Sequence, residues 1–344
     1  MTGKLPESIF EINGPGSFSS AALEIFRYQA SANPVYSAFV SALGINPADV
    51  TDIREIPFLP VEFFRSHRVI SGNAEAGVIF ESSRTTGSEA SRHYVHDLEL
   101  YQLSYLNCFR HFYGEPSDYV IAALLPSYRE RPNSSLVTMM DGLIRESGCA
   151  ESGFYEGRMD ELVAMLEKKR TDGRKRFLIG VSFALLDLAA ELSPDLSGTI
   201  VMEAGGMKGR RKEITRDELH GILTAGLNVP VIHSEYGMTE LLSQAYSCGG
   251  GFFRCPPWMK ILVRDIHDPR DTGDEEGRTG GLNIIDLANY WSCSFLATGD
   301  YGRLYEDGSF GISGRIDNTD IRGCNLMTTR DGFLYSGSEI NYPF

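Results

Sequence analysis

Apolar runs alternate with amphipathic stretches through the middle of the chain. Tyr119–Leu125 is almost continuously apolar, as expected for a strand buried on both faces of a parallel sheet. Asp97–Tyr113 carries apolar residues at helical spacing and starts from an aspartate that can cap a helix. The same patterns predict strands at 78–80, 153–155, 176–181, 199–203 and 231–232, and helices at 136–146, 160–169 and 183–192. Strands and helices in this alternation predict a doubly wound α/β sheet with helices on both faces.

The two ends of the chain follow other patterns. Residues 17–44 predict two helices, the first capped by Ser17 or Ser19 and the second starting after Pro34. After residue 250 the apolar runs are short and glycine is frequent, which predicts a β-rich subdomain with an acidic surface hairpin at 268–281. We therefore expect four parts, namely a helical region 1–77, an α/β core 78–247, a β-rich subdomain 248–317 and a C-terminal segment 318–344.

Composition narrows the class of protein. A length of 344 residues fits one large domain or two. The net charge of −14 argues against a nucleic-acid partner, since nucleic acids select basic surfaces. The first residues lack the basic and apolar regions of a signal peptide, and no apolar run reaches the length of a membrane span. The six cysteines contain no C-x-x-C pair, which favours reduced thiols and a cytoplasmic location.

The stretch 231–247 carries the strongest chemical signal. It begins as an apolar strand, turns through polar residues up to Gly237, and continues at the apolar spacing of a helix. Open α/β sheets bind ligands where a strand ends in such a turn. Tyr236 offers a ring for a base, Thr239 a hydroxyl for a phosphate oxygen and Glu240 a carboxylate for Mg²⁺. This inventory indicates a nucleotide site; the alternative is an ordinary strand-to-helix connection whose polar residues cap the helix.

Further polar turns follow other predicted strands. The loop after 78–80 contains hydroxyls and a glycine that could bind phosphate oxygens, although it is not a Walker A loop and could be a plain turn. Its candidate residues are Ser82, Ser83, Thr85, Thr86 and Gly87. Gly205 and Gly206 permit a close approach of backbone to ligand, and basic residues follow them. Asp300 follows an apolar strand, where a carboxylate can accept hydrogen bonds from the two hydroxyls of a ribose.

Together these motifs resemble a known superfamily. Tyr236–Glu240 resembles the Y-G-x-T-E motif of the adenylate-forming enzymes, 82–87 their S/T-G-T-T-G loop, 298–300 their T-G-D and 314–317 their G-R-x-D. The stretches LLPSYRER, GGMKGRR, IHSEYGMTELLSQAYS and DIRGC resemble one branch, the acyl-protein synthetase (LuxE) of the bacterial luminescence fatty-acid reductase complex. The sequence departs from the phosphate loop in two ways, because Arg84 replaces a glycine and no lysine follows the last glycine.

The resemblance implies a fold, a reaction and roles. It implies the large domain of an adenylate-forming enzyme, which uses ATP and Mg²⁺ to convert a long-chain fatty acid into an acyl-adenylate. Residues 82–87, with Gly205 and Gly206, would hold the triphosphate. Tyr236 would stack on adenine beside Gly237, Thr239 would contact the α-phosphate, and Glu240 would hold Mg²⁺. Asp300 would bind the ribose and Arg315 the ribose or phosphate edge.

The resemblance also implies an acyl acceptor. Its acylated cysteine corresponds to Cys324, which follows Arg322 and Gly323. A neighbouring guanidinium lowers the pKa of a thiol, and a thiolate can take the acyl group and pass it to a reductase partner. The alternative for Cys324 is a buried structural thiol.

One departure leaves the activity open. The sequence ends at Phe344, shortly after Asp317, so we expect the small C-terminal domain with its catalytic lysine to be missing. Other cations such as Lys208 or Arg322 could replace that lysine, the domain could be supplied by another chain, or the activity could be low. Two alternative functions therefore stand beside the synthetase: a catalytically degenerate subunit that binds acyl groups or nucleotides, and an acyl-CoA ligase.

Overall fold

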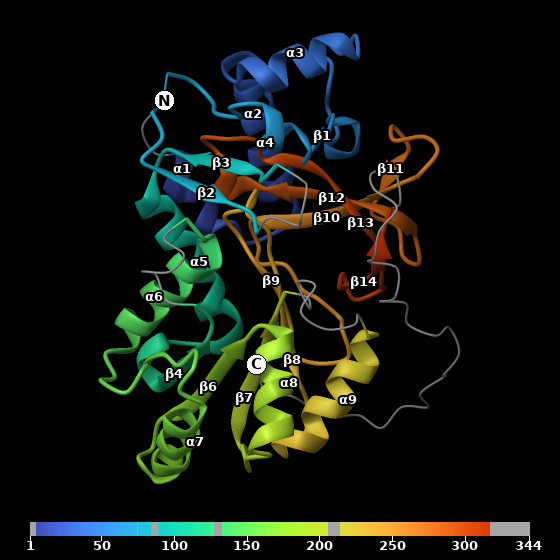
Figure 1. Ribbon diagram of the computed structural model, residues 1–344. Helices are drawn as coiled ribbons and strands as arrows, with labels where there is room; N and C mark the ends of the chain where they lie inside the picture. Colours follow the sequence, from blue (N-terminus) through green and yellow to red (C-terminus); the bar gives the residue numbers. More distant parts are fainter. Residues whose placement is uncertain (1–4, 74, 84–88, 127–132, 206–213, 317–344) are drawn as a thin grey trace.

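The computed structural model describes residues 5–73, 75–83, 89–126, 133–205 and 214–316. Two lobes are visible in Figure 1, a green and yellow one built on a parallel sheet and a blue and orange one built on a mixed sheet. We call them the parallel-sheet lobe, residues 98–247, and the mixed-sheet lobe, residues 5–95 and 250–316. In the described part of the chain, no helix combines the length and the apolar character needed to cross a membrane.

The parallel-sheet lobe holds a six-stranded sheet in the order β5-β4-β6-β7-β8-β9. The first five strands of that order are parallel, and β9 is an antiparallel edge strand. Every residue of β4 is buried, as its apolar run predicts. The strands are β4 Tyr119–Leu124, β5 Gly153–Phe154, β6 Lys175–Gly180, β7 Thr199–Ala204, β8 His233–Tyr236 and β9 Ala245–Ser247.

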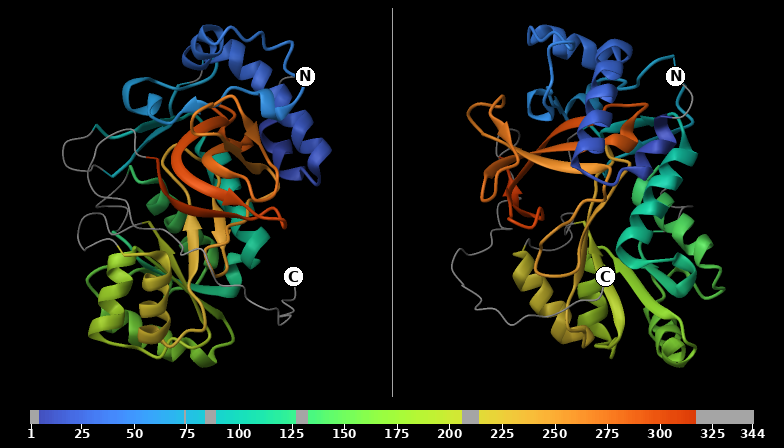
Figure 2. Two further views of the ribbon diagram at one scale, coloured as in Figure 1. Left: turned by 90° about the vertical axis from the view of Figure 1, so that its right-hand side faces the viewer. Right: turned by 180° about the vertical axis from the view of Figure 1, so that it is seen from behind.

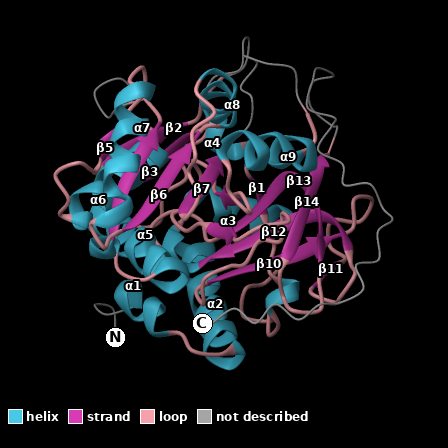
Figure 3. Ribbon diagram, turned by 90° about the horizontal axis from the view of Figure 1, so that it is seen from below, coloured by secondary structure: helices cyan, strands magenta, loops and turns pink. Residues whose placement is uncertain are grey.

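Helices cover both faces of this sheet (Figure 3). They are α5 Leu98–Tyr113, α6 Ser135–Ser147, α7 Met159–Lys168, α8 Ser182–Glu191 and α9 Arg216–Leu227. Right-handed crossovers place α6, beside α5, on one face and α7, α8 and α9 on the other, because the chain reverses direction along the sheet after β5. Asp97 caps α5 by accepting from the backbone N–H groups of Glu99 and Leu100. The predicted doubly wound α/β fold is confirmed.

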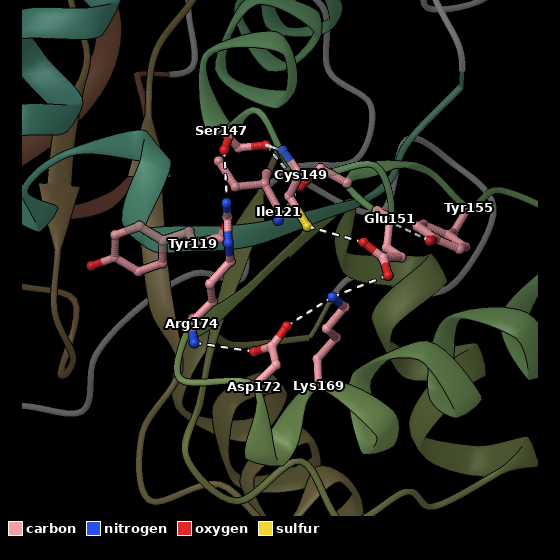
Figure 4. Close-up of polar contacts among 10 residues, drawn as sticks. Tyr119, Ile121, Ser147, Cys149, Glu151, Tyr155, Lys169, Asp172 and Arg174 are labelled. Carbon is pink, nitrogen blue, oxygen red and sulfur yellow. Dashed lines mark hydrogen bonds and ion pairs between the residues drawn. The ribbon is translucent and has the colours of Figure 1, made fainter.

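A polar network holds the edge of the parallel sheet where β4 and β6 begin (Figure 4). Arg174 donates to the carbonyl oxygens of Tyr119 and Ser147. Lys169 Nζ lies 3.0 Å from Glu151 Oε1 and 2.7 Å from Asp172 Oδ2. These contacts tie the turns before β5 and β6 to the start of the sheet.

The mixed-sheet lobe holds the strands predicted after residue 250. Their sheet has the order β1-β13-β12-β10-β11, and β14 pairs with β13. The strands are β1 Leu59–Pro60, β10 Met259–Arg264, β11 Thr272–Gly273, β12 Thr279–Asp286, β13 Phe295–Leu304 and β14 Phe310–Arg315. A separate two-stranded ribbon consists of β2 Val78–Glu81 and β3 Arg92–Val95.

The N-terminal helices pack against this mixed sheet, as the blue and orange segments of Figure 2 show. They are α1 Leu5–Ser8, α2 Pro15–Ala32, α3 Pro34–Ala42 and α4 Phe63–Ser66. Gln29 donates to the carbonyl oxygens of Asn289 and Tyr290 at 2.9 Å each. Strand β1 lies parallel to β13, with Leu59 opposite Leu296. Segments from the two ends of the described chain therefore share one lobe.

Within the described ranges, five short 3₁₀ helices lie between the other elements. They span Ile9–Glu11, Ile53–Glu55, Pro116–Asp118, Lys169–Thr171 and Leu287–Asn289.

Two local predictions near the N-terminus are wrong. Helix α2 starts at Pro15 after Gly14, so neither Ser17 nor Ser19 caps it, because proline at the first position already has helical φ. The strand at 78–80 is not a buried strand of the parallel sheet. Among the described residues it pairs with β3 alone, and Ile79 is 37% exposed.

The predicted helix after Gly237 is also wrong. Residues 238–244 form turns and irregular backbone, and residues 245–247 form β9. Asp286 binds the backbone N–H groups of Leu242 and Ser243, which a helix would direct at its own carbonyls. Tertiary hydrogen bonds therefore override the helical spacing of this apolar stretch.

The T-G-D motif does not follow a strand but lies inside β13. On β12, Leu282 alone lies opposite Thr298, Gly299 and Asp300, because the register shifts between Gly281 and Asn283. The motif is thus a bulge, which re-aims side chains along a strand.

Candidate functional site

Tyr236 joins the two lobes at the end of β8. Its hydroxyl donates to Asp300 Oδ2 of β13 at 2.8 Å. Its ring meets Phe253 and Phe310 edge-on, with centroids 5.9 and 5.5 Å away. Burial, followed by the nearby charge of Asp300, raises the pKa of Tyr236 well above its usual value, so the hydroxyl keeps its proton and acts as the donor.

Asp300 lies between this tyrosine and a basic residue. Arg315 is its partner across the β13–β14 ladder, and Arg315 Nε lies 3.6 Å from Asp300 Oδ1. The Asp300 side chain is 14% exposed, whereas that of Arg315 is 70% exposed. The carboxylate is thus held in place while the guanidinium stays open to solvent.

Asp286 fixes the segment that follows Tyr236. It is fully buried at the end of β12, and its Oδ2 accepts from the backbone N–H groups of Leu242 and Ser243 at 2.9 Å each. Its Oδ1 accepts from the Ser243 hydroxyl at 2.6 Å and from Ala288 N–H at 3.2 Å. Burial raises the pKa of Asp286, and these hydrogen bonds oppose the rise.

Gly237 lies close to a neighbouring carboxylate at the same place. A Cβ at this position would lie 2.2 Å from Glu235 Oε1, the end of a flexible side chain, so a larger residue would displace that carboxylate. The backbone turns here from β8 into the segment held by Asp286.

Glu240 is a second buried carboxylate near the junction. It is 7% exposed, and its side chain is hydrogen-bonded to Ser91 on the segment before β3. Burial raises the pKa of Glu240, and the hydrogen bond to Ser91 opposes that rise. Its backbone carbonyl accepts from Asn289 Nδ2 at 2.8 Å.

Ser91 connects Glu240 to the start of the candidate phosphate loop. Ser91 N–H donates to Ser82 Oγ at 2.9 Å, and Ser82 N–H donates to the Ser91 carbonyl at 3.1 Å. His93, two residues further along β3, donates from Nδ1 to the Thr239 carbonyl at 2.8 Å. Burial lowers the pKa of His93 to about 4, so this imidazole is neutral at pH 7.

The structure thus joins several predicted residues in two groups. Tyr236, Asp300 and Arg315 form one, and Ser82 and Glu240, joined through Ser91, form the other. Ser83 is exposed, and the Gly205 carbonyl accepts from the Ser182 hydroxyl. The predicted residues Thr85, Thr86, Gly87, Gly206 and Cys324 lie outside the described residues. The ligand-binding roles assigned to all these residues stay predictions.

Sequence reasoning missed Asp286, Ser91 and His93. Asp286 had a weak signal, since it is a carboxylate directly after an apolar strand and so could cap the turn that follows. Ser91 and His93 gave no signal that they belong to a site, because a serine and a histidine in or beside a short strand more often face solvent or fill a core.

The residues present are compatible with a magnesium ion. Mg²⁺ commonly takes one or two carboxylates and completes its shell with phosphate oxygens and water. Glu240 offers one carboxylate whose charge is disfavoured by burial, and a nearby cation would relieve that cost. Among the described residues, no group of three or more His, Cys, Asp and Glu could hold a metal by itself.

Comparisons with known proteins place the fold. No model of a known protein family matches the sequence, and none of the curated proteins matches it. An open conformation of 2-hydroxyisobutyryl-CoA ligase in complex with 2-HIB-AMP and CoA superposes with a TM-score of 0.63 at 15% identity, covering 87% of this chain and 70% of that one.

Two further solved structures agree. The luciferase-like enzyme of the nonluminescent mealworm Zophobas morio gives a TM-score of 0.51 at 16% identity, over 80% of this chain and 62% of that chain. A long-chain-fatty-acid-CoA ligase from Archaeoglobus fulgidus gives 0.50 at 16% identity, over 69% and 51%. The chain has the fold of the large domain of adenylate-forming enzymes. It covers 62% of the first of these two chains and 51% of the second.

Proposed function

We propose that this protein activates a long-chain fatty acid with ATP and transfers the acyl group to a cysteine. The observation that carries the proposal is the hydrogen bond between Tyr236 and Asp300, which joins the predicted adenine residue to the predicted ribose residue across the two lobes. The fold supports it, because the ligases that share this fold include one solved with an acyl-adenylate and CoA.

The first step is a displacement at phosphorus. A carboxylate oxygen of the fatty acid attacks the α-phosphorus of ATP, and the bond from that phosphorus to the β-phosphate's bridging oxygen breaks. The products are acyl-adenylate and pyrophosphate. The chain contributes position and charge, since such displacements need aligned oxygens and compensation of developing negative charge. Mg²⁺ at Glu240 would supply part of that compensation.

The second step moves the acyl group to sulfur. A thiolate attacks the acyl carbon, the carbon–sulfur bond forms, and the bond to the AMP oxygen breaks. Burial raises the pKa of the thiols of Cys108, Cys248, Cys255 and Cys293. The Cys149 thiol donates to Glu151 Oε2 at 3.3 Å. The four thiols with raised pKa values are poor thiolates at pH 7, which supports Cys324 as the acceptor. A reductase would then take the acyl group from the protein.

An acyl-CoA ligase is the second candidate function. It is favoured by the 2-hydroxyisobutyryl-CoA ligase structure, which holds CoA and has the same fold. The two candidates share the adenylate and differ only in the thiol that accepts the acyl group.

ATP–pyrophosphate exchange driven by a long-chain fatty acid tests the activation step. We expect exchange with the purified chain and none without the acid; binding of ATP without exchange would favour a degenerate binding subunit. Labelled fatty acid and ATP should then give a hydroxylamine-sensitive acyl-protein. Cys324→Ser should abolish this label and keep the exchange, while Cys149→Ser, the matched control, should keep both. With CoA added to the same assay, release of acyl-CoA without protein labelling would favour the CoA ligase.

A further inference from the structure

Arg264 is a largely buried guanidinium next to the T-G-D bulge. It is the last residue of β10, yet its side chain reaches across β12 to β13. Nη1 donates to the Leu282 carbonyl at 2.8 Å and to Asn283 Oδ1 at 2.9 Å, and Nη2 donates to the Thr298 carbonyl. One side chain thus binds both strands where their register breaks.

The backbone is shaped to admit this arginine. A Cβ at Gly281 would lie 2.5 Å from Arg264 Cζ, so the guanidinium lies where any other residue would project. The Leu282 carbonyl accepts from the Thr298 hydroxyl as well as from Arg264, and that same hydroxyl accepts from Asp300 N–H at 3.1 Å. A chain of hydrogen bonds therefore runs from Arg264 through the bulge to Asp300.

Burying the charge of Arg264 is costly, and nearby carboxylates offset part of that cost. Burial lowers the pKa of Arg264, and the nearby carboxylates of Glu62 and Asp300 oppose that fall. The guanidinium is thus an uncommonly costly way to hold two strands together, and apolar side chains would do so more cheaply. Its fork of donors, however, can fix a bulge in one geometry, which a flexible lysine cannot.

We infer that Arg264 is a positioning residue that aims the Asp300 carboxylate at the ribose of a bound nucleotide and so sets the preference for ribonucleotides over deoxyribonucleotides. This inference rests on the proposed function for the identity of the ligand. It assigns to Arg264 no contact with the nucleotide, since it acts through the bulge and Asp300.

The test compares ATP with 2′-deoxy-ATP and 3′-deoxy-ATP. In fatty-acid-driven exchange, Arg264→Lys should raise the KM for ATP by roughly 10-fold, the value of a lost charge-assisted hydrogen bond, and leave the KM for the deoxynucleotides nearly unchanged. The kcat should change little. Arg278→Lys is the matched control, because Arg278 binds the Val263 and Asp271 carbonyls of the same sheet but not the bulge.

A second variant leaves the arginine in the sequence. Gly281→Ala should displace the guanidinium and reproduce the loss of ribose preference, which keeps the inference testable if Arg264→Lys does not fold. With Asp300→Asn already present, either change should have little further effect on that preference, because both act through the same carboxylate. Equal KM increases for ATP and the deoxynucleotides would mean a merely structural role and overturn the inference.

Calorimetric binding of ATP and 2′-deoxy-ATP separates this inference from the proposed reaction. If the wild-type chain shows no exchange but prefers ATP in binding, the reaction is wrong and the same variants still test Arg264 by affinity. A wild-type chain with equal affinity for both nucleotides, or with none for either, overturns the inference.

Discussion

The two lobes differ in where their polar networks lie. In the parallel-sheet lobe a polar network lies at the sheet edge, where Glu151 and Asp172 stay partly exposed around Lys169, although other polar side chains of this lobe, such as Glu203 and Glu240, are buried. In the mixed-sheet lobe, amides and a carboxylate are buried inside it, among them Gln29, Asn33, Asn283, Asp286 and Asn289. The difference follows from how each lobe is assembled.

The parallel-sheet lobe is built from successive strand–helix units, whose backbone groups pair within the helices and between neighbouring strands. The mixed-sheet lobe brings together segments more than two hundred residues apart, such as α2 and the 3₁₀ turn after β12. Where such distant turns meet, some backbone N–H and C=O groups have no partner in a β-ladder. Buried side chains must therefore form hydrogen bonds with these groups. We expect substitutions to be costly in the mixed-sheet lobe and mild at the edge of the parallel sheet.

The largest effect should come from Asp286→Ala. It would leave the buried N–H groups of Leu242, Ser243 and Ala288 without their acceptor. We expect the free energy of unfolding in urea to fall by about 3–5 kcal/mol, as when one partner of a buried polar group is removed. Asp265→Ala is the control, because Asp265 also accepts from two backbone N–H groups but at the surface. Equal losses in the two variants would contradict the comparison.

Glu240 should behave differently from Asp286, although both carboxylates are buried. Glu240→Gln should keep the fold and reduce Mg²⁺-dependent exchange by roughly 10²–10³, as for one lost electrostatic stabiliser. In the absence of ligands, the stability of Glu240→Gln should also depend less on pH than that of the wild type. Burial raises the pKa of Glu240, so the wild type should lose stability as pH rises through the interval between a glutamate's ordinary pKa and the raised one.

Full exchange in Glu240→Gln would refute the assigned role. Urea titrations from pH 4 to pH 8 with both proteins measure the second effect. A wild type whose stability rises with pH relative to the variant would contradict it.

A smaller cost is expected at Gln29. Gln29→Leu would leave the Asn289 and Tyr290 carbonyls without this donor, and Ser294 N–H without its acceptor. We expect a loss of about 1–3 kcal/mol in the free energy of unfolding. Gln102→Leu is the control, because Gln102 of α5 is exposed. It should change the free energy of unfolding by less than about 0.5 kcal/mol. A loss from Gln29→Leu as small as that from Gln102→Leu would show that α2 docks without this amide.

The smallest effect belongs to Lys169 at the sheet edge. Its ammonium lowers the pKa of Asp172 and of Glu151, so its stabilisation is present above their ordinary pKa values and lost as pH falls through the lowered ones. Lys169→Met should therefore unfold more easily at pH 7 but not at pH 2, and added salt should shrink the difference. The exposed Lys168 gives the control Lys168→Met. A difference that persists at pH 2 would mean that Lys169 acts by packing.

Part of the candidate site could be predicted because its residues lie next to local signals. Tyr236 ends β8 and Gly237 follows it, and a polar turn after a parallel strand indicates a site in any open α/β sheet. The contribution of Ser91 could not be predicted, because it depends on a ribbon that brings Ser82 within 2.9 Å of the Ser91 backbone N–H. Nor could that of Arg264, whose partners lie on two other strands.

The sequence by itself determined β4 to β7 and the helices α5 to α8, since burial on one or both faces gives their apolar residues a regular period. It did not indicate α9, and it placed the strand before Gly237 at 231–232 instead of 233–236. It also determined the cap at Asp97, which depends on residues only two and three positions away. Only the tertiary structure decided that residues 238–244 are not a helix, that T-G-D is a bulge and that β1 lies beside β13. The apolar period indicates which face of an element is buried. It does not indicate the hydrogen bond from Ser243 N–H to Asp286, because the two residues lie 43 positions apart in the sequence.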